Sequence, residues 1–206
     1  SIGKDTQLIM KIALTGHRNG LGKVLNKNLI YHGHIVRGFD IVNDFDINEQ
    51  HIREKVLSMT QGFDVFINNA YCAPGQFEML KLVALCERYK HVINVGSYVT
   101  KLSEQRMDTD DGWLEFTENE RKTYIEQKTL QEDWIREARA EDKTKTLIST
   151  VNPGYMKTNL INDSSTDRAL ELFDISSVVL FQIELAKKNV FIPDIDVLLV
   201  NNQITE

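Results

Sequence analysis

The chain has 206 residues, 42% of them hydrophobic and 26% charged, with a net charge of −6 at pH 7 and a pI near 5.4. This composition is typical of a globular protein with one full core, so we expect a single domain over 1–206, with 1–9 as an N-terminal extension. The negative charge argues against nucleic acid or an anionic membrane as a partner. The chain shows no apolar run of membrane-spanning length and no basic-then-apolar leader, and Cys72 and Cys86 lack disulfide or metal spacing, so we expect a cytoplasmic protein.

Apolar runs and amphipathic stretches alternate along the chain. In chain order, the apolar runs predict strands at residues 12–14, 34–39, 64–70, 91–97, 146–151 and 190–200. Apolar residues at helical spacing predict helices at 21–31, 48–59, 77–89, 118–141 and 176–188, with loops at 98–116 and 155–174. The residues between Asp40 and Asp46 are too few for a crossover helix of normal length. The alternation predicts an α/β fold, a Rossmann-like doubly wound parallel β-sheet with helices on both faces.

Two patterns refine the prediction for the long helix at 118–141. Thr117 followed by Glu120 has the pattern of a capping box, in which each residue satisfies a backbone N–H of the other. Leu130, Trp134 and Ala138 recur at four-residue spacing, and we expect this stripe to pack against the sheet or against a second copy of the chain.

Residues 11–22 read K-I-A-L-T-G-H-R-N-G-L-G and predict a strand, a tight turn and a helix. Glycines at 16, 20 and 22 let the backbone bend sharply and let a ligand approach it closely. A helix that begins there directs its unpaired N–H groups and the positive end of its dipole into the turn. The turn therefore suits a pyrophosphate, although its spacing alone fits a plain strand–turn–helix corner equally well.

Polar residues and tight turns gather where the predicted strands end. Ligands of doubly wound sheets bind outside the carboxyl ends of the strands, so we expect the functional site there. The residues concerned are Thr15, Gly16, Asp40, Asn68, Asn69, Ser97, Asn152, Pro153 and Gly154.

Tyr124 and Lys128 are four positions apart on the long helix, so both project from one face. A phenol has a pKa near ~10, and a nearby ammonium would lower it by stabilising the phenolate. Tyr124 could then exchange a proton with a carbonyl or alcohol oxygen, while Ser97, at the end of a strand, could hold that oxygen. The alternatives are an accidental pair on a solvated, charged helix and an ordinary strand-end serine.

The candidate motifs occur in one order along the chain: T-G-x-x-x-G-x-G at 15–22, N-N-A at 68–70, a serine ending the next strand, Y-x-x-x-K at 124–128 and N-P-G-x-x-x-T at 152–158. In this combination the chain resembles a small, classical-like member of the short-chain dehydrogenase/reductase (SDR) family over residues 11–200. The resemblance implies an NAD(P)-dependent oxidoreductase that interconverts a carbonyl and an alcohol by hydride transfer. It also implies a small-molecule substrate and a homodimer.

The resemblance implies a role for each matching residue. Tyr124 would be the general acid/base, Lys128 would hold the nicotinamide ribose and tune Tyr124, and Ser97 would orient the substrate oxygen. The glycines would cradle the pyrophosphate, residues 46–47 and 69–70 would line the adenosine side, and the residues after Asn152 would border the nicotinamide. The implied cofactor-binding residues are Thr15, Gly16, Arg18, Gly20, Leu21, Gly22, Asp40, Asp46, Ile47, Asn69, Ala70, Tyr124, Lys128, Pro153, Gly154 and Thr158.

Asp40 favours NAD over NADP. At the end of the second strand its carboxylate would accept hydrogen bonds from the adenosine ribose hydroxyls and repel a 2′-phosphate. Arg37 is expected on the opposite face of the strand, but Arg18 in the glycine turn could meet a phosphate. We therefore expect NAD, with NADP as the alternative.

The chain departs from the family pattern in three places. Tyr71 follows N-N-A where the family usually has glycine, and its ring would either narrow the cofactor groove or turn outward. The family's active-site asparagine has no clear counterpart, and Gln76 is the nearest polar candidate. The stretch at 98–116 is long and acidic and could close a site that the short segment after Thr158 leaves open.

Two other functions remain open on these residues. One is a nucleotide-sensing or regulatory protein with little catalysis, which the departures at Tyr71 and Gln76 favour. The other is a sugar-nucleotide epimerase or dehydratase, which shares Tyr-x-x-x-Lys but would need a larger C-terminal part. His32 and His34 lack further ligands, so no metal site is expected.

Overall fold

The computed structural model describes residues 8–102, 117–154, 156 and 170–198, and within them the strands form one parallel sheet of six. The strand order is β2-β1-β3-β4-β5-β6, which confirms the predicted doubly wound parallel sheet. The strands are β1 (Lys11–Thr15), β2 (Ile35–Phe39), β3 (Val65–Asn68), β4 (His91–Val95), β5 (Leu147–Pro153) and β6 (Asp194–Val197).

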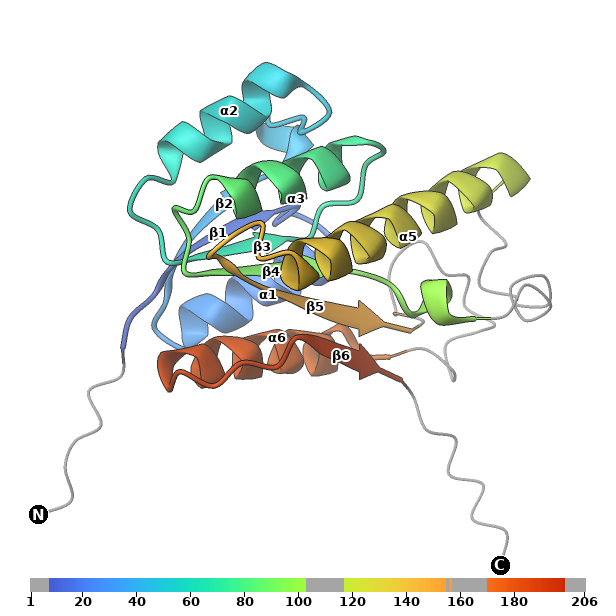
Figure 1. The fold of residues 1–206 in the computed structure, drawn as a ribbon. Coiled ribbons are helices and arrows are strands. Elements are labelled where there is room, and N and C mark those ends of the chain that lie inside the picture. Colours follow the sequence, from blue (N-terminus) through green and yellow to red (C-terminus); the bar gives the residue numbers. More distant parts are fainter. Residues whose placement is uncertain (1–7, 103–116, 155, 157–169, 199–206) are drawn as a thin grey trace, which may run out of the picture.

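Helices cover both faces of the sheet, with α2, α3 and α5 on one face and α1 and α6 on the other (Figure 1). They are α1 (Gly20–Tyr31), α2 (Gln50–Met59), α3 (Gly75–Leu85), α5 (Glu118–Ala140) and α6 (Leu172–Lys187), with short 3-10 turns η1 (Ile41–Asn43) and η2 (Tyr98–Lys101). No helix within the described ranges is both long enough and apolar enough to cross a membrane.

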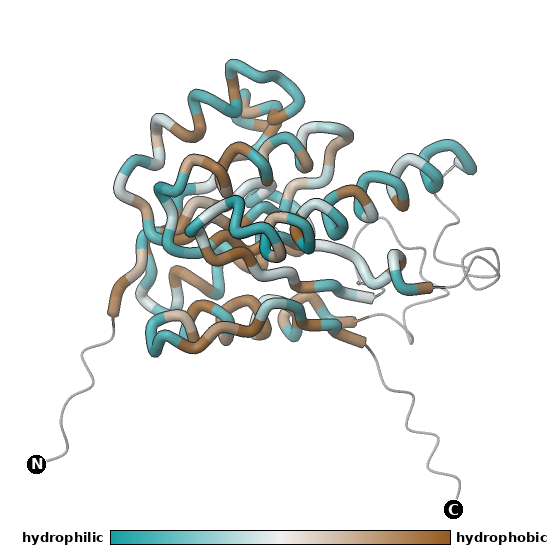
Figure 2. The backbone as a smooth tube through the Cα atoms, viewed as in Figure 1, coloured by the Kyte–Doolittle hydropathy of each residue, from teal (hydrophilic) through white to brown (hydrophobic). Residues whose placement is uncertain are grey.

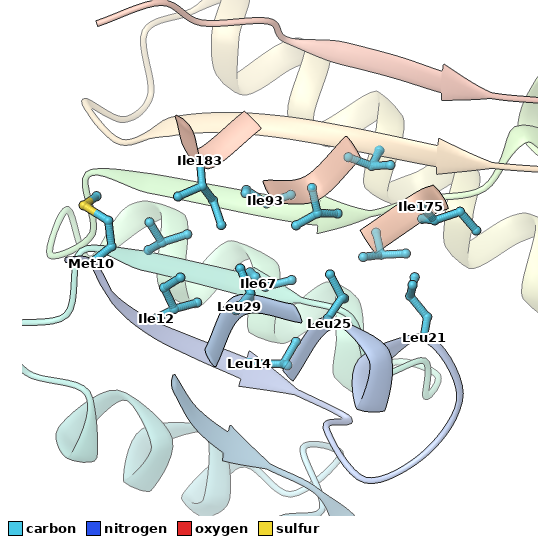
Figure 3. Packing of buried hydrophobic residues seen from close by; sticks show 14 of the residues in the cluster. Met10, Ile12, Leu14, Leu21, Leu25, Leu29, Ile67, Ile93, Ile175 and Ile183 are labelled. Carbon is cyan, nitrogen blue, oxygen red and sulfur yellow. The ribbon is translucent and has the colours of Figure 1, made fainter. Parts of the chain in front are cut away.

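The core on the α1/α6 face is built from aliphatic side chains, because alternate residues of the strands point to this face. Figure 3 shows the strand residues Ile12, Leu14, Ile67 and Ile93 facing Leu21, Leu25 and Leu29 of α1 and Ile175 and Ile183 of α6. The core on the other face is more aromatic and contains Phe39, Phe66, Tyr89, Ile135 and Ile148. The two cores hold the sheet rigidly between helices, so the carboxyl ends of its strands have fixed relative positions.

The local predictions hold for most elements, with differences at their ends. The capping box at the start of α5 is confirmed, since the Thr117 hydroxyl accepts from the Glu120 N–H and the Glu120 carboxylate accepts from the Thr117 N–H. Between Asp40 and Asp46 only the short turn η1 forms, as the spacing predicts. Helix α6 begins at Leu172, within the stretch expected to be a loop, because Leu172 packs against the aliphatic core.

The predicted stripe on α5 is only partly right. Ala138 is buried and Trp134 packs against the core, but Leu130 is 40% exposed. Besides Ala138, the buried residues of α5 are Lys128, Gln131 and Ile135, none of which belongs to the predicted stripe. Figure 2 shows how hydrophilic the N-terminal end of this helix is compared with α6. Two polar side chains of α5 therefore face the sheet, close to the ends of its strands.

Candidate active site

The ends of β1 and β3 are joined by Thr15 and Asn69. The buried Thr15 hydroxyl accepts hydrogen bonds from the backbone N–H groups of Asn69 at 2.9 Å and Ala70 at 3.0 Å. The Asn69 side chain donates to the carbonyl oxygens of Thr15 at 3.0 Å and Gly16 at 3.4 Å. The N-N-A segment thus lies against the glycine turn, while Thr15 holds the turn rather than lining it.

The glycine turn requires glycine for two reasons. Gly16 has φ of 71°, in the left-handed region, and a Cβ on Gly22 would lie 1.8 Å from the Gly16 carbonyl oxygen. Helix α1 begins at Gly20, and its N-cap residue Asn19 makes no side-chain capping hydrogen bond. The Leu21 side chain packs in the core, so only its backbone can face a ligand in the turn.

Asp40 fastens the turn to the end of β2. One of its carboxylate oxygens accepts from the Arg18 N–H at 3.0 Å and the other from the Val42 N–H at 3.1 Å. The guanidinium of Arg37 lies elsewhere, donating to the Met59 carbonyl oxygen, while Arg18 is exposed. Asp40 is 7% exposed, and its carboxylate, with about four acceptor positions, is not saturated by these two hydrogen bonds.

Two apolar side chains beside Asp40 were missed by the sequence analysis. Ile41 and Val42 in η1 are 67% and 69% exposed. Their signal in the sequence is an apolar pair directly after a strand-end aspartate, where a loop would ordinarily be polar. They give this end of the site an apolar surface that suits a flat ring.

The side chains of Asp46 and Ile47 differ in whether a ligand can reach them. The Asp46 carboxylate accepts from the Asn48 N–H at 3.0 Å and is partly exposed. The Ile47 side chain is buried in the core, so only its backbone is available to a ligand.

Ser97 and Tyr124 come together at the end of β4, where their side chains hydrogen-bond. The Ser97 hydroxyl also accepts from the Val99 N–H and caps η2. A salt bridge of 2.6 Å between Lys101 and Asp196 ties η2 to β6. Burial raises the pKa of Tyr124, and the hydrogen bond to Ser97 acts against this rise. The phenol pKa therefore stands above its usual value, not below it as the sequence predicts.

Lys128 is 4% exposed, which excludes its reading as part of a solvated helix face. Its Nζ donates to the side-chain oxygen of Gln76 at 2.9 Å and to the carbonyl oxygen of Val95 at 2.8 Å. Burial lowers its pKa to about 7. An amine in this state gains or loses its charge near neutral pH.

Tyr71 turns inward rather than outward. Its ring makes an edge-to-face contact with Tyr124 at a centroid separation of 4.8 Å. The Lys128 Nζ lies 5.6 Å from the centroid of the Tyr71 ring and 5.5 Å from that of Tyr124. Tyr71 is 40% exposed, and its ring lies against both residues of the Y-x-x-x-K motif.

The end of β5 closes the far side of the site. The Asn152 amide donates to Asp196 at 3.0 Å, and the Gly154 N–H donates to the Val197 carbonyl oxygen at 2.9 Å. Pro153 is buried and Gly154 is partly exposed. Thr158 and the acidic residues of 103–116 lie outside the described residues.

Neither a family model nor a curated protein sequence matches this chain. Solved structures do. A 3-alpha-hydroxysteroid dehydrogenase from Pseudomonas sp. B-0831 complexed with NADH is 16% identical, with a TM-score of 0.68 over 90% of this chain and 95% of that one. A short-chain dehydrogenase/reductase (glucose/ribitol dehydrogenase) from Brucella melitensis is 17% identical, with a TM-score of 0.68 over 93% and 96%.

An alcohol dehydrogenase from Thermococcus sibiricus complexed with 5-hydroxy-NADP is 16% identical, with a TM-score of 0.64 over 96% of this chain and 100% of that one. The chain has the short-chain dehydrogenase/reductase fold. These three structures cover between 90% and 96% of the chain.

Proposed function

We propose that the chain is an SDR family member, an NAD(P)-dependent oxidoreductase that interconverts a carbonyl and an alcohol. One observation carries this proposal: Tyr124, hydrogen-bonded to Ser97 and beside Lys128, lies at the carboxyl edge of the sheet that also bears the glycine turn. These elements are far apart in the sequence, and a fold that served only structure would not need to gather them at one edge.

The glycine turn fits a dinucleotide. A side chain at Gly22 would fill the turn, and the first turn of α1 has no side-chain cap, so its N–H groups suit a pyrophosphate. Asp40 would accept hydrogen bonds from the adenosine ribose, and Asn69 and Ala70 would line the adenosine side. Lys128 would hold the nicotinamide ribose, with Pro153 and Gly154 bordering the nicotinamide.

When bound, a nicotinamide would supply or accept the hydride of the proposed reaction. Tyr124 donates its phenolic proton to the substrate carbonyl oxygen in the reductive direction and removes it from the alcohol in the oxidative direction. Ser97 donates a hydrogen bond to the same oxygen and keeps it beside the phenol. The ammonium form of Lys128 stabilises the phenolate that Tyr124 becomes.

The test compares two tyrosine variants. Tyr124→Phe removes the proton donor and should lower turnover at least about 100-fold, because general acid–base catalysis contributes ~10²–10⁴-fold. Tyr31→Phe, which alters an exposed ring on α1, is the matched control and should behave as wild type. Fluorescence titration with NADH and NADPH in parallel measures cofactor binding. An activity assay with a panel of carbonyl compounds then measures turnover. Full activity of Tyr124→Phe would overturn the assignment, and tenfold tighter NADPH binding would overturn NAD as the preferred cofactor.

A second function is a nucleotide sensor with little catalysis, and the position of Tyr71 favours it. Its ring packs on Tyr124 and covers Lys128, the two residues that a substrate and the nicotinamide ribose would need to reach. Tight NADH binding with no turnover across the carbonyl panel would support this function over the first.

A further inference from the structure

Lys128 is held by a network of buried side-chain amides. The network consists of Asn68 at the end of β3, Asn94 in β4, Gln76 in the first turn of α3 and Gln131 in α5, each of which is at most 1% exposed. Asn68 and Asn94 are register partners in the sheet, and the Asn68 amide donates to the Asn94 side-chain oxygen at 2.9 Å. The Asn94 amide donates to the Gln131 oxygen at 3.1 Å.

The chemistry of its neighbours fixes the orientation of Gln76. Its nitrogen lies 3.1 Å from the Asn68 carbonyl oxygen and 3.2 Å from the Val95 carbonyl oxygen, and both atoms can only accept. Its oxygen must therefore face the other way, where it accepts from Lys128 at 2.9 Å and from Gln131 at 3.3 Å. Reversing the amide would place an N–H against the Lys128 amine, so only one orientation satisfies every partner.

The network has a cost that core packing alone does not explain. The side-chain oxygen of Asn68 is buried and has no hydrogen-bond partner among the residues that the structure describes. Such an unpaired acceptor costs about 1–3 kcal/mol, and apolar residues of similar size would avoid it. What the polar arrangement provides is an oxygen held rigidly against the Lys128 amine.

We propose that Gln76 is the positioning residue of Lys128. Its side-chain oxygen is aimed at the lysine amine because the carbonyl oxygens of Asn68 and Val95 hold its nitrogen on the other side. This role rests on the proposed function, in which Lys128 acts on Tyr124 and on the cofactor. Gln76 touches no reacting atom. It fixes where the charge of Lys128 lies, and it favours the charged form by accepting a hydrogen bond from it.

The experiment follows the titration of Lys128 in the cofactor-free protein, using ¹³Cε-labelled lysine and NMR, with Lys128→Met to assign the signal. Gln76→Glu places a carboxylate beside the amine, so the Lys128 midpoint should rise by about one pH unit or more. Gln76→Met keeps the volume but removes the acceptor, so the midpoint should fall. Opposite shifts from two substitutions at one position are the signature of a direct electrostatic contact.

Gln182→Met is the matched control, because Gln182 is an equally buried glutamine on the other face of the sheet, in α6. It should leave the Lys128 midpoint unchanged, whatever it does to thermal unfolding. Lys128 midpoints that stay within about 0.3 pH unit of wild type in both folded Gln76 variants would overturn the proposal. If Gln76→Met does not fold, Gln76→Glu alone decides by the same criterion. The titration needs no cofactor or substrate, so it judges Gln76 independently of the NADH and carbonyl assays, which judge the proposed function.

Discussion

The structure buries two titratable side chains at opposite ends of β4, and they differ in what surrounds them. His91, at the amino end, is 1% exposed and lies 2.7 Å from the Ser149 hydroxyl, with its other ring nitrogen unpaired among the described residues. Lys128 packs against the carboxyl end, where it hydrogen-bonds Gln76 and the Val95 carbonyl oxygen. Burial lowers both pKa values, to about 4 for His91 and to about 7 for Lys128.

A perturbed pKa alone therefore does not identify a functional residue in this fold. The carboxyl end of a parallel sheet is where loops open toward a ligand, and Lys128 lies there beside a partly exposed tyrosine. At the amino end, His91 is buried, and only one of its two ring nitrogens has a hydrogen-bond partner among the described residues. We interpret it as a structural residue. Position in the sheet separates the two cases.

The largest difference between the two groups should appear in the pH dependence of stability. Lys128 has its pKa at about 7 in the folded chain and near ~10.4 when unfolded, so between these values the unfolded state binds more protons. The free energy of unfolding should therefore rise with pH, by about 3 kcal/mol between pH 7 and 9.5 from this residue. Lys128→Met should remove that rise in urea unfolding followed across this range.

Lys122→Met is the control, because Lys122 lies on the same helix with an exposed side chain. The free energy of unfolding of Lys122→Met should depend on pH as that of the wild type does. If the free energy of unfolding of Lys128→Met rose with pH as steeply as that of Lys122→Met, Lys128 would be charged in the folded protein across this range. Lys128 and His91 would then differ in charge as well as in position.

His91 should give a smaller effect with its own pH window. Its pKa of about 4 in the folded chain lies below the unfolded value near ~6.5, so the unfolded state takes up protons first as the pH falls. The free energy of unfolding should drop by about 2 kcal/mol between pH 6.5 and 4.5 because of this residue. His91→Gln should lack this contribution, while His51→Gln, at an exposed site, should retain it. Equal acid sensitivity of the two variants would contradict the closed environment inferred for His91.

The sequence predicted one part of the molecule well because its signal is local. The aliphatic core under α1 and α6 follows from apolar residues at helical and strand spacing, and the glycine turn follows from residues that are neighbours in the chain. Ser97 follows a strand, and Tyr124 and Lys128 lie on the long helix, as the sequence predicts, although their chemical roles stay predictions.

The sequence did not predict the amide network, because hydrophobic patterning assigns lysine and glutamine to the protein surface. Lys128 and Gln131 are buried on α5, whereas Leu130 is exposed, so the predicted stripe was displaced on the helix. Burial of such groups becomes favourable only when partners from other elements satisfy them, and those partners are distant in sequence. One signal was present: Asn68 and Asn94 each follow apolar residues, at the same register position of adjacent strands.

The smallest expected effect concerns the aromatic cover that distinguishes Lys128 from His91. His91 has the ring of Phe191 beside it, at a centroid separation of 6.0 Å, whereas the Tyr71 ring over Lys128 is 40% exposed. If NADH must displace this ring to reach Lys128, binding breaks the edge-to-face contact with Tyr124, which is worth about 0.5–1.5 kcal/mol. Tyr71→Ala should then bind NADH roughly twofold to tenfold more tightly in a fluorescence titration. Tyr71→Phe keeps the ring contact and should match wild type, and weaker binding by Tyr71→Ala would mean that the ring is a wall of the cofactor site rather than a cover over it.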